Sequence, residues 1–115
     1  MTDDENKTRQ HFRVEYPPEV QPLFIQKKNQ HSIIDLSERG IKFSIERTFR
    51  MKVGDKLEGK VVFSDNDETD IKGKILRLDE AYAVIYLDQR VSLQKIMEQQ
   101  RFLLNKYGTL RQPKK

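Results

Sequence analysis

Two short groups of residues in this sequence carry side chains that can bind an anionic, hydrogen-bonding ligand. Arg9 and Arg13 lie four residues apart near the N-terminus, and Asp35, Ser37 and Gly40 follow in a spacing typical of a turn. A guanidinium group can bond two phosphate oxygens or guanine O6 and N7, and it can stack on a purine. A carboxylate accepts from N–H donors, a hydroxyl reaches a base or a phosphate, and glycine lets a ligand approach the backbone. These five residues are therefore the candidate ligand-binding residues.

Strand periodicity predicts how the segment around Gly40 presents its side chains. Alternate residues of a strand point to opposite faces. If Ile34 and Leu36 face a core, Asp35 and Ser37 share the solvent face. Gly40 stands where the chain must reverse, a place where a positive φ is often needed and only glycine adopts it at low cost.

Three further cations are weaker candidates for the same surface. Lys42 precedes the apolar Phe43 and is expected to point outward beside Asp35. Arg39 and Arg77 are candidates for stacking on a base, although alternation places Arg77 on the same face as the apolar Ile75. They rank below the five residues above.

The elements that must position these residues are short strands. Alternating apolar and polar residues, bounded by turn residues, predict six strands at residues 20–26, 31–37, 41–46, 56–64, 71–78 and 81–87. Strands of this length, joined by hairpin-sized connections, predict an all-β fold with an antiparallel barrel or sandwich. Pro22 lies in the first of them and indicates a sheet edge.

The chain ends in a predicted amphipathic helix at residues 93–107, with Ser92 as its N-cap and Gly108 as its C-terminal stop. Residues at helical spacing form a stripe in which only Gln100 is polar: Leu93, Ile96, Met97, Gln100, Leu103, Leu104 and Tyr107. We expect the stripe to pack on the barrel. The second interpretation, a helix that pairs two copies as a homodimer, stays open.

Length and composition limit the classes of protein. A chain of 115 residues with 36% hydrophobic and 35% charged residues predicts one domain with a small core. We expect a flexible N-terminal arm at residues 1–8, the barrel and helix at 9–107 and a basic tail at 108–115. The net charge of +4 is compatible with an anionic partner. The absence of cysteine, of a 20-residue apolar run and of a signal peptide predicts a cytoplasmic protein without a membrane span.

No catalytic or metal-binding pattern stands out. Without cysteine, and with only His11 and His31, a zinc site is not expected. The segment that begins at Asp65 is not a calcium loop, because its sixth residue is Asp70 instead of glycine and its twelfth is Leu76 instead of glutamate. No nucleophile–base pair is evident, so we predict a protein that is not an enzyme and needs no cofactor.

The two motifs Arg9-x-x-x-Arg13 and Asp35-x-Ser37-x-x-Gly40, in this order, resemble those of the PilZ domain family. The resemblance covers about residues 8–107. It implies a six-stranded antiparallel barrel of the PilZ type with a C-terminal helix, which binds the bacterial second messenger cyclic di-GMP. Thr8, before the first arginine, is the position that the resemblance links to binding of one ligand or a stacked pair.

The resemblance and the residues together predict a receptor. Arg9 and Arg13 are expected to bind phosphate and a guanine Hoogsteen edge, while Asp35 and Ser37 read the base. Because the arginines precede any predicted core, we expect ligand to order this N-terminal segment and so signal to an effector protein. One alternative is a PilZ-like adaptor that binds only protein. A nucleic-acid-binding barrel would need exposed aromatic residues, whereas Phe24, Phe43 and Phe63 are expected to face the core.

Overall fold

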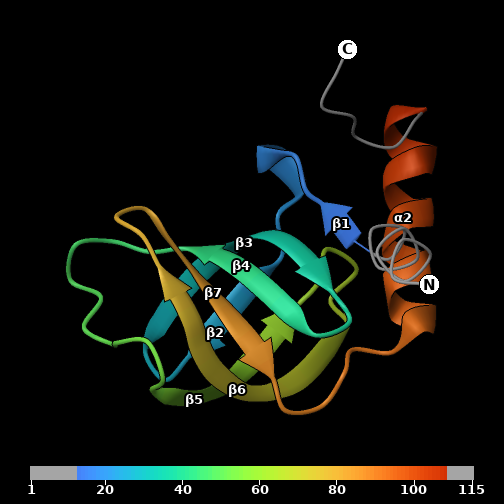
Figure 1. The fold of residues 1–115 in the computed structure, drawn as a ribbon. Coiled ribbons are helices and arrows are strands. Elements are labelled where there is room, and N and C mark those ends of the chain that lie inside the picture. Colours follow the sequence, from blue (N-terminus) through green and yellow to red (C-terminus); the bar gives the residue numbers. More distant parts are fainter. Residues whose placement is uncertain (1–12, 109–115) are drawn as a thin grey trace, which may run out of the picture.

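The computed structural model describes residues 13–108, which form a closed antiparallel β-barrel with one extra strand and one α-helix (Figure 1). The elements are β1 (Arg13–Glu15), a 3-10 turn η1 (Pro18–Val20), β2 (Leu23–Gln26), β3 (Asn29–Ser37), β4 (Gly40–Ser44), β5 (Lys56–Val62), β6 (Glu68–Leu78), β7 (Tyr82–Leu87) and α2 (Leu93–Tyr107). The predicted six-stranded barrel with a C-terminal helix is confirmed.

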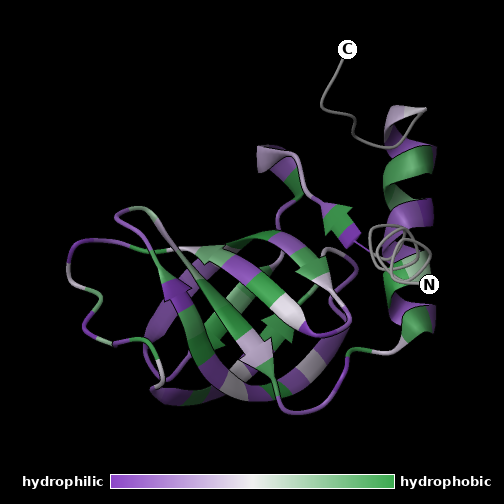
Figure 2. Cartoon of the chain, in the orientation of Figure 1, coloured by the Kyte–Doolittle hydropathy of each residue, from purple (hydrophilic) through white to green (hydrophobic). Residues whose placement is uncertain are grey.

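The barrel closes through β3. Its strands follow the order β3-β2-β5-β6-β7-β4, and β4 pairs back onto β3. β1 pairs antiparallel with the second half of β3, beyond the part of β3 that pairs with β2. Hydrophobic and hydrophilic residues alternate along the strands (Figure 2), so the apolar side chains fill the interior.

The interior contains most of the apolar residues that the alternation predicts to face the core. Phe24, Phe43 and Phe63 are buried, as expected. The other buried hydrophobic residues are Val14, Tyr16, Ile33, Leu36, Ile41, Leu57, Val61, Ile71, Ile75, Ala83, Ile85, Leu87, Val91, Ile96 and Leu103. Among residues 13–108, no helix is both long and apolar enough to cross a membrane.

Two β-bulges change which residues face the core. The register of β3 shifts between Ile33 and Asp35, so Ile33 rather than Ile34 is buried, and the prediction for Ile34 was wrong. A second shift between Ile75 and Arg77 turns Arg77 outward, away from the face of Ile75. A bulge adds one residue to one strand and so reverses the alternation after it.

The N-terminal end of the barrel also differs from the prediction. The first predicted strand begins at Leu23 instead of residue 20, because residues 18–20 form a 3-10 turn after Pro17. Before this turn the chain already forms β1, which the sequence reading did not predict.

α2 packs against β1 by a face that is partly polar (Figure 1). The N-cap and C-terminal stop are confirmed: Lys95 N–H donates to Ser92 Oγ at 3.1 Å, and Gly108 has a φ of 77°. Only two of the six apolar residues in the predicted stripe, Ile96 and Leu103, are buried. Its other large apolar members are exposed: Leu93, Met97, Leu104 and Tyr107. The homodimer interpretation stays a prediction.

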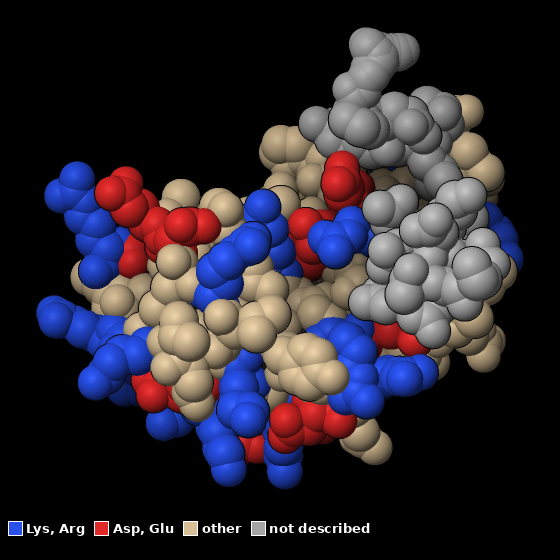
Figure 3. Space-filling model, in the orientation of Figure 1, with Lys and Arg blue, Asp and Glu red and all other residues tan. Residues whose placement is uncertain are grey.

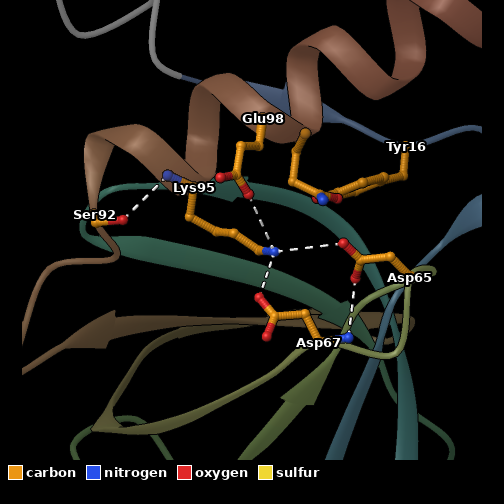
Figure 4. Close-up of polar contacts among 7 residues, drawn as sticks. Tyr16, Asp65, Asp67, Ser92, Lys95 and Glu98 are labelled. Carbon is orange, nitrogen blue, oxygen red and sulfur yellow. Dashed lines mark hydrogen bonds and ion pairs between the residues drawn. The ribbon is translucent and has the colours of Figure 1, made fainter.

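The polar residues on the packed face of α2 have partners on the barrel (Figure 4). Lys95 Nζ lies 2.6 Å from Asp67 Oδ2 and 3.9 Å from Asp65 Oδ2, both in the β5–β6 loop, and 3.5 Å from Glu98. Burial lowers the pKa of Lys95, but these three carboxylates outweigh it and raise that pKa. The lysine therefore joins the helix to the loop as a charged group.

We expect Asp67→Asn to lower the free energy of unfolding at pH 7. The hydrogen bond and the charge of Lys95 lower the pKa of Asp67 below its ordinary value of 3.8. A carboxyl with a lowered pKa stabilises the fold above its unfolded-state pKa, and this contribution is lost as pH falls through the folded-state value. Urea unfolding between pH 7 and pH 2.5 should show that the free energy of unfolding falls with pH in the wild type and falls less in the variant. Glu80→Gln, in the exposed β6–β7 turn, is the control; equal pH profiles for wild type and Asp67→Asn would contradict the expectation.

Candidate functional site

Three strands bring most of the predicted site residues to one outer face of the barrel. In the β1–β3 register Arg13 lies opposite Ser37, and in the β3–β4 register Asp35 lies opposite Lys42. Gly40 begins β4, directly after the turn that follows Ser37. Arg9 lies outside the described residues.

Arg13 and Asp35 form an ion pair on this face. Arg13 Nη1 donates to Asp35 Oδ1 at 3.3 Å. The arginine side chain is 51% exposed, whereas that of Asp35 is only 13% exposed. Burial raises the pKa of Asp35 above its ordinary value of 3.8, although the charges of Arg13 and Lys42 act in the opposite direction. The site thus offers an exposed guanidinium beside a shielded carboxyl group.

Ser37 and Gly40 close the turn between β3 and β4. Gly40 N–H donates to Ser37 Oγ at 3.2 Å, and the serine hydroxyl lies 3.3 Å from Gly40 O. The expected positive φ at Gly40 was wrong, because within residues 13–108 the glycines with positive φ are Gly54 and Gly108. A Cβ at Gly40 would meet its nearest neighbours, Ile85 O and Ser37 Oγ, at an ordinary 3.5 Å. Gly40 therefore matters for the open surface it leaves rather than for its backbone conformation.

β1 holds Arg13 in place without any ligand. Val14 and Tyr16 are buried, and Tyr16 N–H donates to Ile34 O at 3.0 Å. The Tyr16 hydroxyl donates to Gln99 Oε1 at 2.7 Å, and Gln100 Nε2 donates to Arg13 O at 3.4 Å, so α2 fixes the strand from the other side. The expectation that this segment has no core of its own was wrong for residues 13–16.

The weaker cationic candidates lie around this face. Lys42 Nζ sits 4.0 Å from the centre of the Tyr82 ring. Arg39 is bound to backbone, since its Nη1 donates to Leu87 O at 3.0 Å and to Asp88 O at 3.2 Å. In Figure 3, Lys and Arg side chains border the uncharged surface over β4 and β7. This face of the barrel is suited to an anionic ligand with flat rings.

The sequence reading missed Glu15, which lies opposite Asp35 in the β1–β3 register. Its negative charge raises the pKa of Asp35 further. The alternation of charged and apolar residues from Arg13 to Tyr16 was the available signal for a strand there. In the part of the chain that the structure describes, no group of three or more His, Asp or Glu side chains could hold a metal ion.

Comparison with known proteins gave one family and a similar structure. The sequence model described as PilZ domain matches residues 7–105, which is most of the chain. No curated protein matches the sequence. The crystal structure of an uncharacterized Legionella protein is similar, with a TM-score of 0.59 and 14% sequence identity. The match covers 84% of this chain and 98% of the Legionella chain. At this identity the structural likeness concerns the fold alone.

Proposed function

The chain belongs to the PilZ domain family, and on that premise we propose that it is a receptor that binds cyclic di-GMP on the outer face of β1, β3 and β4. The observation that carries the proposal is the single surface formed by Arg13, Asp35 and Ser37, with Gly40 open beside it. PilZ domains are binding domains, and the proposed role needs neither a catalytic residue nor a metal ion or cofactor.

Each residue has a role that follows from its chemistry. Arg9 and Arg13 bind phosphate oxygens and the O6–N7 edge of a guanine, a pairing that the planar guanidinium makes with two hydrogen bonds. Asp35 accepts from guanine N1–H and the exocyclic amine, so it distinguishes guanine from adenine. Ser37 and the backbone at Gly40 contact the same base or a phosphate. Asp35 must exchange its ion pair with Arg13 for the ligand, which leaves Arg13 free to bind the anion.

Isothermal titration calorimetry with cyclic di-GMP, beside GTP and cyclic GMP, tests this function. We expect micromolar or tighter binding of cyclic di-GMP and much weaker binding of the two mononucleotides, which present fewer of the paired groups. The ratio of ligand to protein will show whether one molecule or a stacked pair binds. If no binding is seen at millimolar cyclic di-GMP, the receptor function is contradicted. That result would favour the adaptor that binds only protein.

We further propose that ligand binding orders the residues before Arg13 and that this change is read by an effector protein. Hydrogen exchange of the backbone amides of residues 5–16, measured with and without ligand, tests this proposal in two parts. Amides of residues 13–16 should be protected without ligand, because β1 is paired with β3 and Val14 and Tyr16 are buried. Amides of residues 5–12 should gain protection only with cyclic di-GMP. Unchanged exchange of residues 5–12 at saturation would rule out this form of signalling while leaving binding intact.

A further inference from the structure

Next to the proposed site, a row of outward residues continues across β4, β7, β6 and β5. Gly40 lies opposite Tyr86, Tyr86 opposite Lys74, and Lys74 opposite Lys56. Neighbouring strands are about 4.8 Å apart, so Tyr86 lies roughly two strand spacings from Ser37. Because Gly40 has no side chain, β4 contributes no side chain to this row between Ser37 and Tyr86.

Tyr86 lines a shallow hollow of about 370 Å³ together with Val53, Gly54, Lys74, Ile75 and Leu76. Three of these are large and exposed: Val53 at 62%, Leu76 at 59% and Tyr86 at 45%. Leu76 faces outward because it follows the buried Ile75 in the alternation of β6. The lining thus combines one aromatic ring and apolar side chains with a single cation, Lys74.

Arg39 contacts the tyrosine ring. Its guanidinium carbon lies 5.4 Å from the ring centre of Tyr86, and the guanidinium is itself held by the carbonyls of Leu87 and Asp88. Arg39 does not line the hollow, so the cation and the hollow meet the ring at different places. This contact restricts the ring, so the ring loses less side-chain freedom when a base stacks on it.

Lys74 and Lys56 give the row a positive charge. Two lysines directly opposite each other repel, and within residues 13–108 neither has a carboxylate partner within ion-pair distance. A phosphate placed between the aromatic ring and these lysines would relieve that repulsion.

We propose that Tyr86 and this hollow form a second base subsite, in which one guanine of cyclic di-GMP stacks on the Tyr86 ring while Lys74 contacts the adjoining phosphate. The inference rests on the proposed function and adds residues that neither motif contains. Its occupant is a nucleobase because Tyr86, which lines the hollow, lies opposite Gly40 at the edge of the proposed phosphate- and guanine-binding face. Stacking does not read base edges, so Asp35 supplies the selection for guanine and Tyr86 supplies affinity.

Tyr86→Ala should weaken cyclic di-GMP binding about tenfold or more, as alanine substitution does at base-stacking residues. Tyr86→Phe should bind within about twofold of the wild type, because stacking uses the ring rather than the hydroxyl. Tyr107→Ala removes another partly exposed tyrosine, on α2, and is the matched control. If the wild type binds and Tyr86→Ala binds equally well, the subsite is wrong and the receptor stands. If the wild type does not bind, the receptor fails, and the subsite fails with it.

A measurement on the wild type guards against a Tyr86→Ala variant that folds poorly. In the NMR spectrum of the saturated complex we expect nuclear Overhauser effects between guanine H8 and the Tyr86 ring protons. Their absence, with contacts from the base only to residues of β1, β3 and β4, would overturn the subsite.

Discussion

Arg13→Ala is expected to weaken the binding of cyclic di-GMP by about one to two decades. A hydrogen bond to a charged group contributes roughly 1.5 to 3 kcal/mol, and about 1.4 kcal/mol corresponds to a factor of ten in affinity. The same substitution should change the free energy of unfolding little, because the Arg13 side chain is half exposed and surface ion pairs contribute roughly 0 to 1 kcal/mol. Calorimetric titration and urea unfolding of the same samples separate the two effects.

Two further variants sharpen this result. Arg13→Lys keeps the charge but cannot make the two parallel hydrogen bonds of a guanidinium, so its affinity should lie between those of wild type and Arg13→Ala. Arg101→Ala removes an exposed arginine from α2 and should bind as the wild type does. Equal losses for Arg13→Ala and Arg101→Ala would mean that only net charge matters, and full affinity in Arg13→Ala would remove this residue from the site.

The second large effect is expected for stability, at Gly59 in β5. A Cβ at this position would collide with Ile25 O and would lie 2.6 Å from Cε1 of the buried Phe24 ring. Neither group can move easily, since the carbonyl belongs to the paired strand β2 and the ring is packed in the core. Overpacking of a core typically costs 1 to 3 kcal/mol and occasionally more, so we expect Gly59→Ala to lower the free energy of unfolding by about 3 kcal/mol.

Gly40→Ala is the matched control for Gly59→Ala. Its Cβ would meet its nearest neighbours at 3.5 Å, and Gly40 has no positive φ, so the fold should accept it. The variant should unfold in urea at nearly the wild-type concentration, although a methyl group on the open face can hinder the ligand. Similar stability of Gly59→Ala and Gly40→Ala would contradict the packing described for β2 and β5.

Residue alternation was sufficient to predict the barrel strands and the outward direction of Asp35, Ser37 and Lys42. It failed where the pairing is irregular, because a bulge such as that at Ile34 depends on the partner strand and leaves no local signature. β1 was missed because its alternation runs only from Arg13 to Tyr16, and four residues before Pro17 are too few for periodicity alone to indicate a strand.

The helix shows a different limit of sequence reading. Hydrophobic spacing assumes that apolar residues mark the packed face, whereas Lys95 and Gln99 are buried here and Leu93 and Met97 are exposed. A buried polar residue becomes favourable only when a partner lies opposite, as Asp67 does for Lys95 and Tyr16 for Gln99. Such partners come from distant parts of the chain.

The sequence predicts which residues form the candidate site, but it does not predict how they come together on one surface. The motifs contain Arg13, Asp35, Ser37 and Gly40. The ion pair between Arg13 and Asp35, however, depends on the register of β1 against β3. The neighbouring Tyr86 belongs to no motif. Its position beside Gly40 follows only from the pairing of β4 with β7.

Titration of the isotopically labelled protein with cyclic di-GMP, followed through the backbone amide signals, tests the central claim most directly. We expect large shifts for the amides of residues 13–15, 35–42 and 82–86, the segments of β1, β3, β4 and β7 that carry the proposed binding residues and Tyr86. The amides of the β5–β6 loop, including Asp67, should shift little. Absence of shifts at saturating ligand, or shifts centred on that loop, would contradict binding at the surface of Arg13 and Asp35.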